Sequence, residues 1–164
     1  MPSMKFKGLK IYTKDIVRLY NMSEEHIKRA VYQGAKHVAD TVRAELEAVP
    51  AISEEESRRG YRENRPTTIS ETQKRDLLYS LGLAPMENNA GFINTKVGFE
   101  GYNSIETKNY PQGQPNALIA RSLNSGSVAL IRNPFMRRAT SKSRKKAEKA
   151  MEKTLDEEIA KAIR

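Results

Sequence analysis

Residues 23–50 read SEEHIKRAVYQGAKHVADTVRAELEAVP and form the longest periodic stretch of the chain. Apolar residues recur here every three or four positions, the spacing of one helical face, whereas a half-buried strand would alternate at every second residue. Ser23 is a good N-cap, Glu24 and Glu25 suit the positive end of the helix dipole, and Pro50 ends the pattern. The stretch predicts a one-faced helix with small residues that permit close packing: Ala30, Gly34, Ala35 and Ala39.

Further helices are predicted along the chain. Ser70 caps a shorter one that ends at Gly82, and Pro134 opens a final one that runs to about residue 163. Residues 50–67 are polar, rich in both charges and without periodicity, so we expect a long charged surface loop there. The remaining expected elements are short: an extended piece at 5–7, a helix at 13–20, a helix at 116–123 and an extended segment at 127–131.

The clearest strand covers residues 93–99, where apolar and polar side chains alternate between Gly91 and Gly101. Because this strand and the first helix are each apolar on one side, we expect them to pack together. The predicted fold is α+β, a single domain over residues 1–164 in which a long N-terminal helix and a C-terminal helix pack on a small antiparallel sheet. The expected core joins Ile27, Val31, Val38, Val42 and Leu46 of the helix to Ile93, Val97 and Phe99 of the strand.

The charge of the chain is concentrated in one segment. The 164 residues carry 29 Lys and Arg against 20 Asp and Glu, a formal charge of +9, and residues 132–153 alone hold +7 of it. An element of this kind is expected to face an anionic neighbour. The chain has no cysteine, which excludes disulfides, thiolate metal sites and cysteine nucleophiles. No apolar run is long enough for a membrane span or a secretory signal, so we expect a soluble protein made in a cytoplasm.

The final helix has an unusual order of charges. Its basic residues lie in the N-terminal half, and Asp156, Glu157 and Glu158 lie towards the C-terminal end. The helix dipole favours the opposite arrangement by a few tenths of a kcal/mol per charge. We therefore expect another interaction to compensate, with either an anionic partner or a neighbouring subunit.

Catalytic and cofactor signatures are weak in this sequence. The only imidazoles, His26 and His37, are eleven positions apart with no zinc motif, and His37 beside Asp40 is typical of a solvated helix surface. The S-x-x-K pattern at 143–146 lies inside a run of like charges, and the glutamates at 54–56 lack the spacing of a cation loop. No phosphate-binding glycine loop is present. We expect no catalytic residue, no metal, no cofactor and no enzymatic activity.

Two C-terminal motifs carry a resemblance to a known family. Residues 116–127 read NALIARSLNSGS, and residues 132–139 read RNPFMRRA. With the long first helix and the segments at 77–81 and 96–99, they resemble in order the neck and tail-completion proteins of long-tailed bacteriophages, also called minor tail or head–tail joining proteins. The likeness covers most of residues 22–164. The sequence departs from the family pattern in its charged insertion after Pro50 and in Arg138, which stands where the family has a second proline.

The resemblance implies a structural virion protein that forms a ring at the junction of head and tail and surrounds the DNA channel. Its implied partners are copies of itself in a cyclic homo-oligomer, with a hexamer favoured over a dodecamer, and the other neck, head-closure and tail proteins. Its implied location is the virion, after assembly in the host cytoplasm.

The start of the final helix is the predicted contact surface, because two large apolar side chains stand there beside five bases. The charges would face acidic protein or phage DNA, without base-specific readout. The alternative function is a small DNA-binding protein that uses this basic helix, and no membrane contact is expected. The interface candidates are Phe135, Met136, Arg137, Arg138, Lys142, Lys145 and Lys146.

Overall fold

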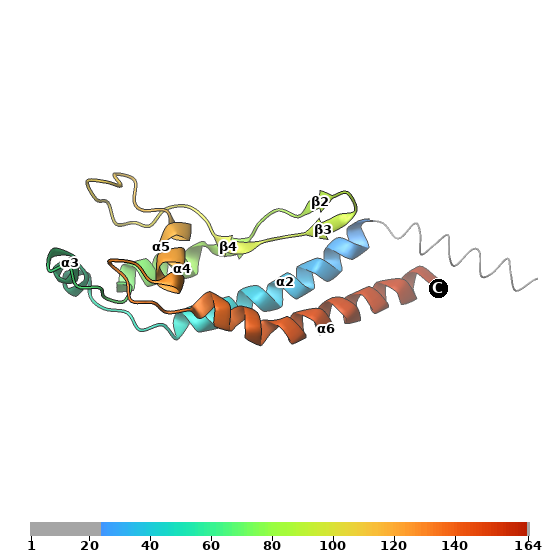
Figure 1. Ribbon diagram of the computed structural model, residues 1–164. Helices are drawn as coiled ribbons and strands as arrows, with labels where there is room; N and C mark the ends of the chain where they lie inside the picture. The colour runs from blue at the N-terminus through green and yellow to red at the C-terminus, as the bar shows by residue number, and fades with distance from the viewer. Residues whose placement is uncertain (1–23, 164) are drawn as a thin grey trace, which may run out of the picture.

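The computed structural model describes residues 24–163 (Figure 1). The expected elements at 5–7 and 13–20, and the cap at Ser23, lie outside the described residues. The helices and strands follow one another as α2 (Glu24–Glu47), α3 (Glu54–Arg62), α4 (Glu71–Ser80), β1 (Leu81–Leu83), β2 (Glu87–Asn89), β3 (Phe92–Asn94), β4 (Val97–Phe99), α5 (Asn116–Ser125) and α6 (Phe135–Ile163).

The two long helices, α2 and α6, pack side by side in opposite directions along the length of the molecule (Figure 1). Their seam uses the small residues that the sequence predicted. Gly34 is buried against α6, and a Cβ added there would lie 2.5 Å from Cγ of Met151. Ala30 and Ala35 are buried beside it, whereas Ile27 remains 39% exposed. The N-terminal half of α2 therefore packs chiefly on α6 through small side chains.

The strands form an antiparallel hairpin in two parts. β1 pairs with β4, with Gly82 opposite Gly98, and β2 pairs with β3, with Asn88 opposite Ile93. The expected single strand at 93–99 is thus divided in two. Between the two parts, the three residues 84–86 stand opposite the two residues 95–96, so the first strand bulges by one residue. Pro85 lies in this bulge and has no N–H to continue the ladder of hydrogen bonds. The fold class is α+β as predicted, with both long helices packed on the small sheets.

One hydrophobic core joins the C-terminal half of α2 to the other elements. Val42 and Leu46 are buried in it, and Val38, Val97 and Phe99 pack partly buried against it, as the sequence predicted. α4, α5 and the start of α6 complete the core with Leu77, Leu81, Ile119, Leu123, Phe135 and Ala139. The predicted helices at 71–81, 116–123 and 134–163 are present, and Ser70 forms a capping box with Gln73.

Residues 50–67 are not a continuous loop, because α3 lies inside them. Ser53 caps this helix by accepting a hydrogen bond from the Glu56 N–H. Three glutamates follow in the first turn and two arginines stand in the last, the order that the helix dipole favours. Gly60 packs so closely on Thr67 that a Cβ would lie 2.4 Å from its Cγ2. Local capping and charge order therefore form a helix where hydrophobic periodicity is missing.

Residues 127–131 do not form a strand, although part of the expected extension is present. Leu130 makes a single parallel bridge with Thr67, whose N–H donates to the carbonyl of Ala129. The Ser127 hydroxyl accepts hydrogen bonds from the N–H groups of Ala129 and Leu130. These bonds fold residues 127–130 into a turn. This local hydrogen bonding competes with an extended ladder.

Candidate functional site

The seven candidate residues at the start of α6 do not form one exposed surface. The first of them, the apolar Phe135, lies in the interior of the protein. Phe135 is completely buried, and its ring meets that of Phe99 edge-on at 6.1 Å. Met136 packs partly buried against the same core. The prediction that Phe135 anchors a partner is therefore wrong, because the hairpin and α5 already cover this side chain.

Two of the five candidate bases are used within the molecule. Arg138 donates from Nε to Glu45 Oε2 at 2.7 Å, and Lys142 donates to the other oxygen of the same carboxylate. These hydrogen bonds, first from Lys142 and then from Arg138, lower the pKa of Glu45 below its usual value. Glu45 is buried in the last turn of α2, beside the N-terminal end of α6. Arg138 and Lys142 therefore compensate a carboxylate of this chain.

The opposite end of the α2–α6 pair has the reverse arrangement. Glu158 of α6 is buried and accepts from Arg29 Nη1 at 3.1 Å and from Lys161 at 2.9 Å, with His26 Nε2 at 3.3 Å. The hydrogen bond from Lys161 lowers the pKa of Glu158 despite the opposing effect of burial. Charged side chains of α2 thus compensate part of the unfavourable charge order of α6: Glu45 pairs with bases in its N-terminal half, and Arg29 pairs with Glu158 near its C-terminal end.

The remaining candidates, Arg137, Lys145 and Lys146, are exposed on α6, together with Lys149 one turn beyond Lys145. None of these four side chains makes a hydrogen bond or ion pair with another residue of 24–163. We call this set the α6 basic surface. It keeps a positive charge that no neighbouring carboxylate neutralises, which suits phosphate groups or an acidic protein surface.

A groove that the sequence did not predict lies at the α3 end of the molecule. It has a volume of about 1070 Å³ and lies between α3 and residues 105–110. α5 and residues 127–130 also line it, together with the single residues Thr67, Gln73 and Gln114. Tyr61 and Tyr110 stand on its two sides, with Ile119 and Leu130 among the apolar lining. We call it the α3 groove. Its size lies at the upper end of the range of ligand sites.

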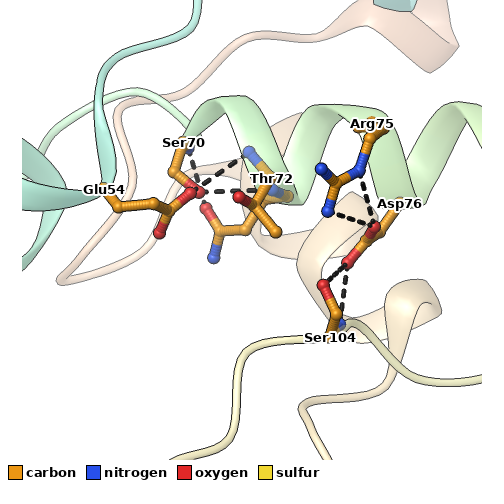
Figure 2. Close-up of polar contacts among 7 residues, drawn as sticks. Glu54, Ser70, Thr72, Arg75, Asp76 and Ser104 are labelled. Carbon is orange, nitrogen blue, oxygen red and sulfur yellow. Dashed lines mark hydrogen bonds and ion pairs between the residues drawn. The ribbon is translucent and has the colours of Figure 1, made fainter.

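Both walls of the α3 groove are fastened to α4 by carboxylates (Figure 2). Glu54 of α3 accepts the N–H of Thr72 at 3.1 Å, and Asp76 of α4 accepts both the N–H and the hydroxyl of Ser104 at 2.7 Å. Burial alone would raise the pKa of each carboxyl group, but these hydrogen bonds outweigh it and lower the pKa of both. α3 and the segment that begins at Ser104 are therefore each anchored to α4 through an ionised carboxylate.

A second exposed feature lies at the other end of the molecule, where the β2–β3 hairpin projects beside the start of α2 (Figure 1). Phe92 in β3 is 76% exposed, although Ile93 next to it is partly buried. Neither the hairpin tip nor the groove was predicted from the sequence. The available signals were an apolar Phe92 on the otherwise polar side of the 93–99 alternation, and the cap and charge order of 53–62.

Other kinds of site find no support in residues 24–163. They contain no group of three His, Cys, Asp or Glu side chains that could hold a metal ion. Of the helices described, none is long and apolar enough to cross a membrane. His37 is exposed, and its carbonyl accepts the Thr41 hydroxyl, while His26 faces Glu158. In comparisons with known proteins, no family model, curated protein or solved structure matches the chain.

Proposed function

We propose that this protein is a structural component of a tailed-phage virion, which forms a cyclic ring at the head–tail junction around the DNA channel. The observation that carries the proposal is the exposure of apolar side chains on two different surfaces at opposite ends of an elongated protomer. Phe92 belongs to β3, at one end, and Tyr61, 74% exposed, belongs to α3, at the other (Figure 1). Val128, 96% exposed, stands between two residues that line the α3 groove.

Such a distribution suits a ring because each subunit of a ring uses two different surfaces in a heterologous contact. A two-fold dimer would need only one surface that is complementary to itself. Exposed large apolar side chains are costly to hydrate, and contiguous patches of them mark contact sites. The two ends of this chain are therefore suited to meet those of neighbouring copies.

The resemblance supports the same role. Four of its motif segments are scattered in the sequence but meet at one core. Leu77, Leu123 and Phe135 are buried in this core, and Phe99 packs partly buried against it. Residues that jointly specify a core are what a family with a common fold would retain. The motifs at 116–127 and 132–139 thus act through the fold, and the contact surfaces are provided by other residues.

The proposal is tested in phage that encode this chain. Particles made without it should accumulate as filled heads and separate tails, and supplying the purified protein should restore joining. Electron microscopy of labelled virions should place the protein at the neck. Normal particles in its absence, or a label anywhere else in the virion, would overturn the proposal.

The second candidate is a small DNA-binding protein, and the α6 basic surface is the observation that favours it. Four exposed cations without carboxylate partners in the described chain can neutralise phosphates and release counterions. Binding of the purified protein to duplex DNA should then weaken steeply as salt increases, without sequence preference. Affinity that does not change with salt would exclude this function.

A further inference from the structure

We infer that the tip of the β2–β3 hairpin of one copy inserts into the α3 groove of the next copy, and that this contact closes the ring. The inference deepens the proposed function and rests on its cyclic assembly. The partner is a second copy of this chain. The contact is heterologous because the hairpin and the groove lie at opposite ends of the protomer (Figure 1).

The hairpin tip has a backbone conformation that its first turn residue does not favour. β2 ends at Asn89 and β3 begins at Phe92, so Ala90 and Gly91 form the turn, with φ values of 54° and 88°. Positive φ at both positions is typical of a type I′ turn, in which Asn or Gly is the ordinary first residue. Alanine is strained there and also makes the tip less polar. Such a residue destabilises an isolated hairpin but suits a tip that is buried in a partner.

Phe92 continues this apolar tip on the solvent side of the hairpin. Successive residues of a strand point to opposite faces, and Ile93 is the partly buried neighbour. The side of β3 that carries Phe92 is therefore turned away from Ile93, and 76% of Phe92 is exposed. An exposed aromatic ring beside a strained apolar turn has the composition of a contact hot spot.

The α3 groove offers the matching chemistry. Tyr61, Tyr110, Ile105 and Leu130 line it, so an aromatic ring that enters meets both aromatic edges and aliphatic side chains. A groove of about 1070 Å³ is large for a small molecule and suits the tip of a two-stranded ribbon.

The charges of the groove also favour the hairpin over nucleic acid. Three basic and three acidic side chains line the groove, which leaves it without net charge and without attraction for a phosphate backbone. The tip, residues 88–93, carries no charged side chain. The nearest charges are Glu24 of α2, which pairs with Lys28 and interacts with the Asn88 side chain, and Glu87 at the base of the tip. The groove offers Glu87 the bases Arg62 and Lys108, which make no ion pair within residues 24–163. The lining charges are Arg58, Arg62, Lys108, Glu54, Glu55 and Glu106.

The absence of cysteine from the chain permits a direct test by cross-linking. Asn89→Cys and Ala129→Cys are made in separate copies of the full chain, mixed, and treated with a short bismaleimide, so that Phe92 is kept in the tip. Asn89 is exposed at the end of β2. Ala129 is exposed and lines the groove. The mixture should give a covalent dimer of the two variants, and neither variant should give one alone. The double variant should give a ladder of covalent oligomers that ends at the size of the ring.

The control replaces Asn89→Cys with Tyr79→Cys, on a residue of α4 that is 94% exposed and does not line the groove. It should give no dimer with Ala129→Cys. An oligomer in solution that forms without the Asn89→Cys and Ala129→Cys cross-link would overturn the hairpin contact and leave the ring of the proposed function intact. A protein that stays monomeric and uncross-linked at every concentration would also overturn the inference, while the neck location would still be judged on virions.

Substitution at the tip gives an independent test by sedimentation. Phe92→Asp should weaken self-association at least about tenfold, whereas Tyr79→Asp should not. Ala90→Asn should leave the monomer at least as stable to urea, because asparagine accepts positive φ, and should still weaken association. Unchanged association of Phe92→Asp and Ala90→Asn would show that the tip lies outside the interface.

Discussion

Phe135 lies where the first turn of α6 meets the hairpin, and it is the largest completely buried side chain of the described residues. Its ring fills the space beside Phe99, so truncation leaves a cavity that rigid neighbours fill only in part. Phe135→Ala should therefore destabilise the monomer by about 3–5 kcal/mol. Urea unfolding of the purified chain measures this, with the partly buried Met136→Ala as the milder companion. A loss below about 1 kcal/mol would contradict the assignment of Phe135 to the core.

Protonation of Glu45 at low pH should weaken the packing of α2 against α6. Its pKa is lowered by hydrogen bonds from Lys142 and Arg138, so the folded state favours the ionised carboxylate. The resulting stability is complete above the usual glutamate value of 4.5 and is lost as the pH falls through the lower folded pKa. Since the side chains of Arg138 and Lys142 are 41% and 64% exposed, water screens both ion pairs, and Glu45→Gln should cost about 1 kcal/mol at neutral pH.

The difference between the wild type and Glu45→Gln should shrink as the pH is lowered below 4.5, because protonation removes the same interaction. Thermal unfolding at a series of pH values measures it. The matched control is Glu47→Gln, an exposed glutamate two residues away that makes no side-chain contact in the described part of the chain. A difference that stays constant with pH would mean that the charge of Glu45 is not what stabilises the fold.

At the scale of elements, the α2–α6 seam depends on close approach at one glycine. A Cβ at Gly34 would lie 2.5 Å and 2.8 Å from Cγ and Sδ of Met151, and 3.3 Å from the backbone oxygen of Ala147. The flexible Met151 side chain can move away from the new methyl group, and alanine favours the helix more than glycine does. Gly34→Ala should therefore hardly change the stability of the protein. Gly34→Leu cannot be accommodated in this way and should cost at least about 2 kcal/mol. Calorimetry compares the two, and equal melting temperatures would contradict a tight seam.

The elements that were predictable from sequence are those with a periodic apolar face. α2, α4, α5 and α6 all contribute a stripe to one core, and hydrophobic spacing with caps such as Ser70 and Pro134 is enough to locate them. α3 was missed because its only buried residue is Gly60, so its stability comes from Ser53, dipole-matched charges and Glu54 instead of a stripe.

The candidate surfaces depend on tertiary packing, so they could not be predicted from the sequence. Residue type alone cannot separate Phe135, which is buried, from Phe92, which is exposed, because the difference arises from tertiary packing. Nor can it tell which bases of α6 meet Glu45, since that contact joins residues that are far apart in sequence. The α3 groove is lined by at least four separated segments, which are α3, residues 105–110, α5 and residues 127–130, and no local pattern encodes it.

On the scale of the whole molecule, the protomer is elongated and has distinct ends. The hairpin tip lies at one end, the α3 groove lies at the other, and α2 and α6 connect them as a rigid pair (Figure 1). The α6 basic surface lies along this connecting pair, so it is independent of the contacts proposed at the two ends. In a ring built end to end, it would recur once per subunit, as a repeated positive patch suited to a DNA channel.

Charge reversal of the α6 basic surface tests this arrangement. Lys145→Glu, Lys146→Glu and Lys149→Glu together should leave the monomer folded to within about 0.5 kcal/mol per site, because these side chains are exposed and make no ion pair in residues 24–163. Lys142 is left unchanged because it donates to Glu45, and its replacement would leave that buried carboxylate with one partner fewer and destabilise the fold. The variant should still form covalent rings through its hairpin and groove, but should lose salt-dependent affinity for duplex DNA and the ability to restore head–tail joining.

The control for that variant carries the same change of net charge elsewhere, as Lys36→Glu, Lys96→Glu and Arg121→Glu, three exposed bases outside α6. If only the α6 variant fails to join heads to tails, the position of the positive charge matters and not its total. If both variants fail equally, the effect comes from the overall field of the protein. If both restore joining and bind DNA as the wild type does, the α6 basic surface is a solvated helix face, and the role of the protein depends on its two ends alone.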